Sequence, residues 1–238
     1  MAIGKDIFDL SDRIGYSFKD VSLLECALTH VSYTNEQRTR GIVAASNERL
    51  EFLGDAVLEI VISEYLYSNF SKYREGTLTK MRQQLVCEKT LCEIALEIDL
   101  GSYINLGNGE ELTACRKRPK ILADALEALI AAVYLDSLSQ GTDAYRRIVM
   151  ALFEDAIEDA AELKKTDYKT TLQQMTEQDG SSILEYVTVE ENGPEHSKQF
   201  TVVAYINNNE VGRGSANTKK SAEMLAAKAA LNLFGVKV

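Results

Sequence analysis

The sequence is poor in the residues that build thiol and imidazole metal centres. Its 238 residues include four cysteines and two histidines. Cys26, Cys87, Cys92 and Cys115 form no Cys-x-x-Cys pair, so we expect no zinc site. Two isolated histidines also cannot supply a phosphohydrolase of the His-Asp type, which needs them clustered. We expect the cysteines to be reduced and the protein to be cytoplasmic.

Long apolar runs and basic charge are scarce as well. Charged residues between Lys5 and Arg13 interrupt the start, and no apolar run reaches the roughly 18 residues that span a bilayer, so we expect neither a signal peptide nor a membrane segment. The net charge is -10. Residues 1–165 hold 19 basic and 27 acidic side chains, and residues 166–238 hold 7 and 9. Any binding of a polyanion must therefore depend on local clusters.

Proline occurs only at positions 119 and 194, and helical spacing dominates the chain before about residue 180. Apolar residues recur every three or four positions over about 47–70, and helices are also predicted over roughly 6–13, 21–30, 77–95, 120–136 and 142–163. Thr142 is an expected N-cap of the last of these. We predict an all-α domain over residues 1–163.

A different pattern follows an expected linker at 164–166. Helical spacing over about 167–178 precedes alternating stretches at 183–190 and 199–206, which indicate strands. The asparagine run at 207–209 is a turn signal, and a short strand near 210–214 and a helix over about 218–234 follow. Residues 167–238 are therefore predicted to form a small α+β domain with the order α-β-β-β-α.

The stretch 47–55 places three carboxylates on one helix face. Glu48, Glu51 and Asp55 are spaced at i, i+3 and i+7, which brings them to the same side. Gly54 in mid-helix costs about 1 kcal/mol against alanine, which indicates close packing against another backbone. Carboxylates on a helix face are more often simply solvated, so this stretch alone leaves both interpretations open.

A second stretch, 121–130, carries Asp124 and Glu127 at i and i+3 among apolar neighbours. A carboxylate in such surroundings is costly unless it is paired or bound to a metal. Two helices that each lend carboxylates to a shared core are a recurrent design for a divalent-metal site. Oxygen ligands suit Mg²⁺ or Mn²⁺.

Residues 47–58, Asn-Glu-Arg-Leu-Glu-Phe-Leu-Gly-Asp-Ala-Val-Leu, resemble the signature of the ribonuclease III family. Residues 28–32, 75–82 and 122–129 are similar to further family segments, so the resemblance covers nearly the whole chain. It implies an endonuclease that cuts double-stranded RNA with Mg²⁺, or Mn²⁺ as a substitute, and leaves 5′-phosphate and 3′-hydroxyl ends with short 3′ overhangs. It also implies a homodimer that processes ribosomal and messenger RNA precursors.

The resemblance also assigns the acidic residues. The implied metal ligands are Glu51, Asp55, Asp124 and Glu127. Asp55 and Glu127 would also position the attacking water, and Glu48 and Glu75 would be further acidic residues of the catalytic cleft. In the family the position of Glu75 lies where the partner subunit docks; by itself, Glu75 would be an acid favoured at a helix start. We expect no membrane association and no small-molecule organic cofactor.

The C-terminal unit resembles a double-stranded RNA-binding domain, which reads the shape and phosphates of a duplex. Lys219 and Lys220 open its last helix, where free backbone N–H groups form an anion site, although two solvated lysines are the simpler alternative. His196 resembles the residue that reaches into the minor groove, and Gln173 and Gln174 would add contacts. Basic clusters at 116–120 and around Glu75 could hold RNA backbone or be solvated. A protein that grips duplex RNA without cutting it stays open as an alternative.

Overall fold

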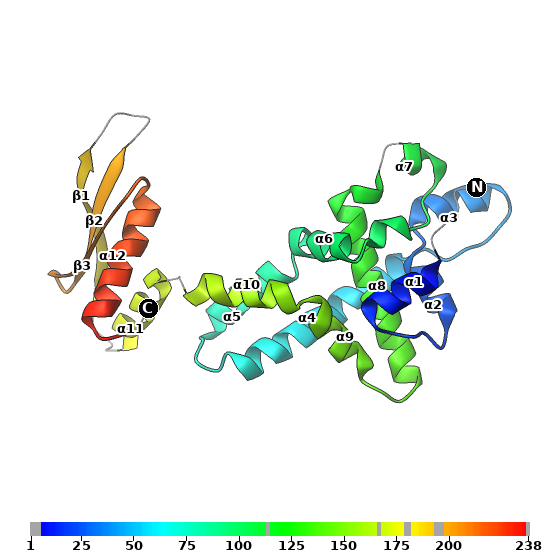
Figure 1. Ribbon diagram of the computed structural model, residues 1–238, viewed down its shortest axis with the longest axis horizontal. Helices are drawn as coiled ribbons and strands as arrows, with labels where there is room; N and C mark the ends of the chain where they lie inside the picture. The colour runs from blue at the N-terminus through cyan, green and yellow to red at the C-terminus, as the bar shows by residue number, and fades with distance from the viewer. Residues whose placement is uncertain (1–5, 113–114, 166–167, 179–181, 193–197, 237–238) are drawn as a thin grey trace. The chain divides into compact units, whose positions relative to one another are not determined.

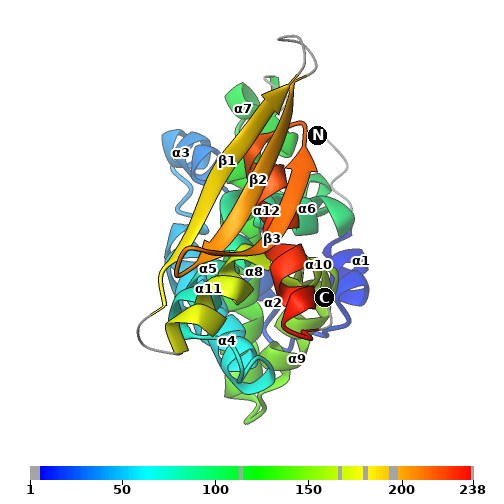
Figure 2. The same ribbon diagram turned by 90° about the vertical axis from the view of Figure 1, so that its left-hand side faces the viewer.

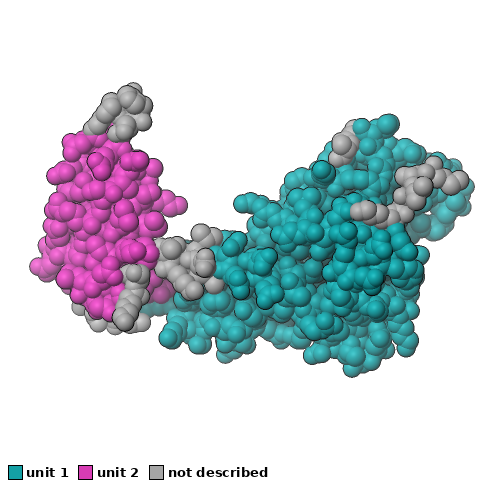
Figure 3. All heavy atoms as spheres, in the orientation of Figure 1, with its two compact units in different colours: residues 1–160 teal, residues 161–238 magenta. Residues whose placement is uncertain are grey.

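The computed structural model describes residues 6–112, 115–165, 168–178, 182–192 and 198–236 (Figure 1). The chain divides into two compact units, residues 1–160 and 161–238, coloured separately in Figure 3. The first is helical and the second combines helices with a sheet. This confirms the predicted fold class. In the described part of the chain, no helix combines the length and apolar character needed to cross a membrane.

The first unit is built around two long helices that pack on each other. Its helices are α1 (Ile7–Ile14), α2 (Val21–Ala27), α3 (Val31–Thr39), α4 (Glu48–Asn69), α5 (Glu75–Leu85), α6 (Glu88–Glu97), α7 (Asn108–Leu112), α8 (Pro119–Ser139), α9 (Ala144–Leu152) and α10 (Glu154–Lys165). Short 3-10 turns lie at Leu100–Ser102 and Cys115–Lys117. Helices α4 and α8 meet in the core, to which they contribute Leu58, Ile62, Leu126 and Leu129.

Helix α8 is buried along most of its length because its sequence is apolar on nearly every side. It begins at Pro119, which suits a first helical position because no intrahelical partner is needed for the missing N–H. Asp124 and Glu127 are half-buried, whereas Ala123, Ala125, Leu126 and Ala128 around them are buried. The two acids therefore mark the part of this stretch that stays open to solvent.

Two predicted helices are each two helices in the structure. The segment 77–95 breaks after α5, where Cys87 adopts an extended conformation and Thr90 Oγ1 donates to the Gln84 carbonyl (2.8 Å). The segment 142–163 breaks at the fully buried Phe153. Thr142 is not the N-cap that we expected: its hydroxyl donates to the Ser137 carbonyl (3.2 Å) and thereby satisfies the end of α8. Helical periodicity persists across such breaks, so spacing alone cannot locate them.

Two further differences concern a helix that was not predicted and the end of one that was. Helix α3 was not among the predicted helices: it has no buried residues, so it lacks the apolar stripe that reveals a helix in sequence. Helix α10 continues through Lys165, into the stretch 164–166 that we expected to be a linker. The last residues of α10 are a leucine and two lysines, which have high helix propensity, so the helix can continue beyond the point where the apolar spacing ends. Residues 166 and 167 lie outside the described part.

The second unit is a three-stranded antiparallel sheet with two helices against one face. Its elements are α11 (Tyr168–Gln178), β1 (Leu184–Asn192), β2 (Gln199–Ile206), β3 (Asn209–Ala216) and α12 (Lys219–Leu233), and the strand order is β1-β2-β3. Figure 2 shows the sheet in front of both helices. Asn207 and Asn208 have positive φ angles of 49° and 65°, which form the tight turn that the asparagine run predicted.

The glycines of β3 let α12 approach the sheet closely. A β-carbon at Gly212 would overlap the backbone of Ala226 and Ala230, and one at Gly214 would overlap that of Ala222 and Ala226. Small residues on both elements thus bring helix and strand backbones together. The first turn of α12 is in this way held at a defined position beside the sheet.

Candidate metal centre and nucleic-acid interface

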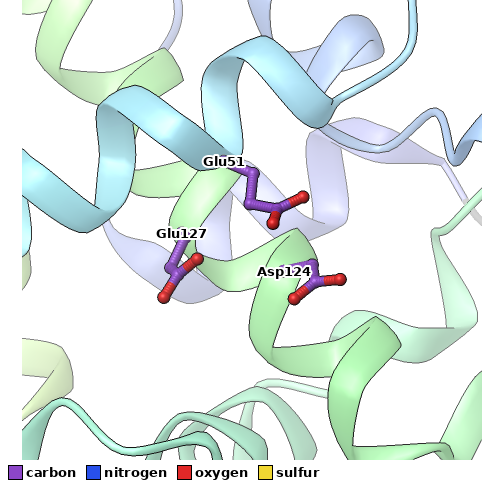
Figure 4. Close-up of side chains that lie close together, drawn as sticks. All are labelled: Glu51, Asp124 and Glu127. Atoms are coloured by element: carbon purple, nitrogen blue, oxygen red, sulfur yellow. The ribbon is translucent and has the colours of Figure 1, made fainter.

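Three carboxylates from two helices meet in the first unit. Glu51 of α4 and Asp124 and Glu127 of α8 each offer an oxygen, and these oxygens lie within 4.8 Å of one another (Figure 4). All three side chains are half-buried. Carboxylates this close repel one another unless positive charge lies among them. The structure therefore brings together three of the four expected metal ligands.

Gly54 is what allows the two helices to come this close. A β-carbon at this position would overlap the backbone carbonyl of Glu127. The close packing predicted from the mid-helix glycine is confirmed. Glu51 lies one turn before Gly54 on α4, so the contact that seats the two backbones against each other also sets the approach of Glu51 to Glu127.

The electrostatics of the cluster show an excess of negative charge. Burial raises the pKa of Glu127 to about 7, and repulsion from Asp55, Glu51 and Asp124 adds to the shift. Burial also raises the pKa of Glu51, with a further contribution from Asp124. A bound cation would remove this repulsion and favour the ionised forms of both glutamates.

Lys120 places a positive charge beside the cluster. Its ammonium donates to Asp124 Oδ1 (3.1 Å) and lies 3.0 Å from Oδ2, and it opposes the rise in pKa of both Glu51 and Glu127. From the sequence, Lys120 was expected only to belong to a basic cluster that could hold RNA. Its position four residues before Asp124 on one helix was the available signal for this pair.

The other expected acidic residues lie around or away from this cluster. Asp55 is exposed but near enough to raise the pKa of Glu127. Glu48 is exposed and accepts a hydrogen bond from Ser46 Oγ (2.8 Å). Glu75 is at the start of α5, where it accepts a hydrogen bond from Thr79 (2.8 Å) and lines a different hollow. Within one chain, therefore, Glu75 is not part of the described cluster.

The donor set fits a hard divalent cation. The three convergent side chains offer only carboxylate oxygens, which Mg²⁺ and Mn²⁺ prefer and which zinc and copper sites usually supplement with nitrogen or sulfur. The cluster is half-buried and deficient in positive charge, unlike acids on an open helix face. These properties favour the metal interpretation over that of simple solvation.

The basic cluster at 116–120 is only partly available for RNA. Arg116 is used internally: its guanidinium donates to the carbonyls of Gly101 (2.7 Å) and Ile104 (2.8 Å) and pairs with Glu111. Arg118 lies 3.6 Å from Glu110. These bonds tie the segment before α8 to its surroundings, so its arginines serve the fold of this region.

In the second unit, the expected RNA contacts lie on separate elements. Gln173 is exposed and donates to Glu177 Oε1 (3.0 Å), and Gln174 is half-buried on the same helix. Lys219 and Lys220 are exposed in the first turn of α12, where Thr218 Oγ1 accepts the N–H of Ser221 (3.1 Å). His196 lies outside the described residues.

Comparisons with known proteins match both units. Residues 20–156 match the family model described as Ribonuclease-III-like, and residues 168–233 match the double-stranded RNA binding motif. A protein named Ribonuclease 3 from Caldanaerobacter subterraneus is 44% identical over 228 residues, which cover 95% of this chain and 97% of the relative. Another of that name, from Geobacillus kaustophilus, is 45% identical and is covered to 89%.

A solved structure resembles the first unit. The nuclease domain of ribonuclease III from Campylobacter jejuni, described with a region involved in dimer formation, is 41% identical with a TM-score of 0.56. The match covers 63% of this chain and 97% of the solved one. The helical unit thus matches a whole nuclease domain.

Proposed function

The chain belongs to the ribonuclease III family, and on this premise we propose that it hydrolyses phosphodiester bonds of double-stranded RNA with a divalent metal. The observation that carries the proposal is the convergence of Glu51, Asp124 and Glu127. The products would have 5′-phosphate and 3′-hydroxyl ends with short 3′ overhangs. Processing of ribosomal and messenger RNA precursors in the cytoplasm is the role we propose for it.

We propose four ligands for the metal, which is Mg²⁺ or, as a substitute, Mn²⁺. They are Glu51, Asp55, Asp124 and Glu127. A bound divalent cation polarises a phosphate and lowers the pKa of a water ligand. Asp55 and Glu127 orient the attacking water, Glu48 adds negative charge beside them, and Glu127 must lose its proton before it can act as a ligand. The water would lose one proton as its oxygen bonds to phosphorus, the bond from phosphorus to the 3′ oxygen would break, and the 3′ oxygen would take up a proton.

We propose that the second unit binds the RNA duplex. Lys219 and Lys220 would contact phosphates at the start of α12, where backbone N–H groups also face outward. Gln173 and Gln174, on α11, would reach the minor groove together with His196. Duplex RNA is read mainly through its shape, 2′-hydroxyls and phosphates, so a few separated contacts suffice even in a unit that is acidic overall.

We also propose that the chain is a homodimer that pairs through α4 and α5. Phe52, Ile60 and Tyr67 form an exposed apolar stripe on α4, with 81%, 53% and 78% of their surfaces accessible. Beside it lies a mainly apolar hollow of about 450 Å³ between α4 and α5, whose lining includes Leu66, Tyr67, Tyr73, Glu75, Leu78 and Arg82. Exposed rings and a hollow on one surface can complement each other across a twofold axis. Glu75 would then lie at the subunit interface.

Incubation of the purified chain with a long RNA duplex, with and without Mg²⁺, tests the nuclease. We expect short duplex products only with the metal. Glu127→Gln should abolish cleavage and leave RNA binding intact, whereas the control Glu158→Gln, at an exposed position on α10, should cleave normally. Normal turnover by Glu127→Gln would contradict the site. A duplex that is bound but uncut in both Mg²⁺ and Mn²⁺ would favour a protein that binds RNA without cutting it.

A further inference from the structure

Glu191 lies between two lysines of the second unit. Its Oε1 accepts a hydrogen bond from Lys198 Nζ (2.7 Å), and its Oε2 lies 3.7 Å from Lys219 Nζ. The lysines come from the segment before β2 and from the first turn of α12. The Glu191 carboxylate thus partly neutralises the positive charge of Lys219, a lysine that is proposed to contact RNA.

A bulge in β1 is what places Glu191 on this side of the sheet. Up to Thr188 the strand alternates regularly, with Thr188 opposite Val202, but Glu190 then pairs with Thr201 and Glu191 with Phe200. Val202 and Phe200 face the core under the helices. The bulge therefore turns Glu191 toward α12, whereas Glu190 takes the opposite face with Thr201; without the extra residue, Glu191 would keep the face of Glu185 and Val187.

A second carboxylate repeats the arrangement. Glu223, one turn after Lys219 on α12, accepts a hydrogen bond from Lys169 of α11 (2.6 Å). Lys169 Nζ also lies 4.7 Å from the centre of the Tyr186 ring, and Lys219 Nζ lies 5.3 Å from that of Phe200. Among the described residues, Lys220 has no ion-pair partner. Lys169 and Lys219, near the start of α12, are thus both paired with a carboxylate of the same chain, whereas within the described part of the chain Lys220 is not.

These pairs contribute little to folding. The side chains of Glu191, Lys198 and Lys219 are 41%, 40% and 58% exposed, and exposed ion pairs add little to stability because water and salt screen them. Their main effect is on charge: a phosphate that approaches Lys198 or Lys219 must displace the carboxylate or tolerate its repulsion. Residues 166–238, with 9 acidic and 7 basic side chains, have little other positive charge to offset that cost.

We propose that Glu191 is an internal competitor of the RNA phosphate, which sets the affinity of the second unit for duplex RNA. The inference rests on the proposed contact between Lys219 and RNA. It assigns to Glu191 a tuning role: the carboxylate weakens binding and makes it less dependent on salt, because salt screens the internal pair as well as the RNA contact. It also adds Lys198 to the residues that contact RNA.

The test compares Glu191→Gln with Glu190→Gln, in the full chain, by binding to a fluorescent RNA duplex in EDTA so that cleavage cannot occur. Both variants lose the same charge, but only Glu191 faces the lysines. We expect Glu191→Gln to bind about threefold to tenfold more tightly than the unchanged chain, with a steeper loss of affinity between about 50 and 200 mM salt. Glu190→Gln should change the dissociation constant less than twofold.

Several outcomes would overturn the inference. Equal effects of the two variants would show that net charge alone matters. Weaker binding by Glu191→Gln, with an unchanged unfolding temperature, would show that Glu191 instead positions the lysines for RNA. If the unchanged chain does not bind the duplex at all, the proposed function fails and the inference fails with it, whereas binding by the unchanged chain with no effect of Glu191→Gln defeats the inference alone.

Discussion

The backbone carbonyl of Glu127 occupies the space where a β-carbon of residue 54 would lie, and only glycine leaves that space free. The carboxylate cluster depends on this contact because Glu51 and Glu127 belong to the two helices that meet there. A single missing methyl group thus links the packing of the core to the geometry of the candidate catalytic site.

Gly54→Ala should therefore damage both stability and activity. The added methyl must push α4 and α8 apart, which we expect to cost about 1–3 kcal/mol, as overpacking of a core usually does. Cleavage should fall more steeply than stability, because the carboxylates separate. Denaturant unfolding and a cleavage assay in Mg²⁺ would measure the two effects.

Gly76→Ala is the matched control. Gly76 is also in a helix, α5, but a β-carbon there meets no atom within 4 Å. This change should be neutral or stabilise the protein by up to about 1 kcal/mol, since alanine favours the helix. If Gly54→Ala and Gly76→Ala change the free energy of unfolding by the same amount, the close approach of the two helices at Gly54 does not limit which residue fits there.

Glu127 should make both stability and the proposed metal binding depend on pH. Its pKa of about 7 without metal means that the folded chain holds this proton more tightly than the unfolded chain does, where the pKa is near 4.5. The stability of the metal-free protein should therefore fall as pH rises from about 4.5 to about 7. Metal must displace the same proton, so Mg²⁺ affinity should weaken as pH falls below about 7.

Glu127→Gln isolates this effect. Without metal, the variant should be more stable than the unchanged chain at pH 8, and the difference should vanish toward pH 4.5. One pKa unit corresponds to about 1.4 kcal/mol, and solvent around a half-buried group reduces the effect, so we expect roughly 1–2 kcal/mol at pH 8. Denaturant titrations in EDTA would measure it. A variant less stable at pH 8 than the unchanged chain would contradict the assignment.

Asp136 has a structural role, and its contribution to stability should be lost at acidic pH. Its fully buried carboxylate accepts hydrogen bonds from Tyr16 Oη (2.7 Å), the N–H groups of Lys19 (3.1 Å) and Asp20 (2.8 Å), and Gln140 Nε2 (2.8 Å). Burial alone would raise its pKa, but these bonds hold the pKa below the usual 3.8. The carboxylate thereby anchors the segment before α2 to α8.

Asp136→Asn should cost about 2–4 kcal/mol at pH 7, because an amide cannot accept all four bonds. The lowered pKa means that the contribution of Asp136 is present above pH 4 and is lost as pH falls through the folded-state value. We would measure the unfolding free energies of the variant and the unchanged chain at pH 7, 4 and 3. The difference between them should be largest at pH 7 and should shrink toward pH 3. The exposed Asp143→Asn serves as a control, with little change expected.

The proposed dimer depends on the exposed stripe of α4. Phe52→Glu would place a charge in an apolar interface, which we expect to raise the dissociation constant at least tenfold. Light scattering over a range of concentrations would show the shift toward monomer. Phe8→Glu, at an exposed phenylalanine of α1 with 57% of its surface accessible, is the control. A Phe52→Glu chain that stays as associated as this control would exclude the stripe from the interface.

Sequence patterns predicted the local features well because each depends on near neighbours. The spacing of Asp124 and Glu127 put them on one face of a helix through the 3.6-residue period alone. The strand predicted over 199–206 has the bounds of β2, although four consecutive residues of β2 are buried instead of alternating, and the asparagine run forms the expected turn. Helix breaks such as the one at Cys87 escaped prediction, because apolar spacing continues on both sides of the turn.

The sequence by itself determined which helices carry the acidic residues, the order of the second unit and the family. Tertiary structure alone decided which of these residues meet. Glu51 joins Asp124 and Glu127 only because α4 and α8 touch at Gly54, while Glu75 lies elsewhere in the chain. Glu191 faces Lys219 only because a bulge reverses its side of the strand. Periodicity is a property of one segment, whereas a distance between segments depends on packing that no single segment encodes.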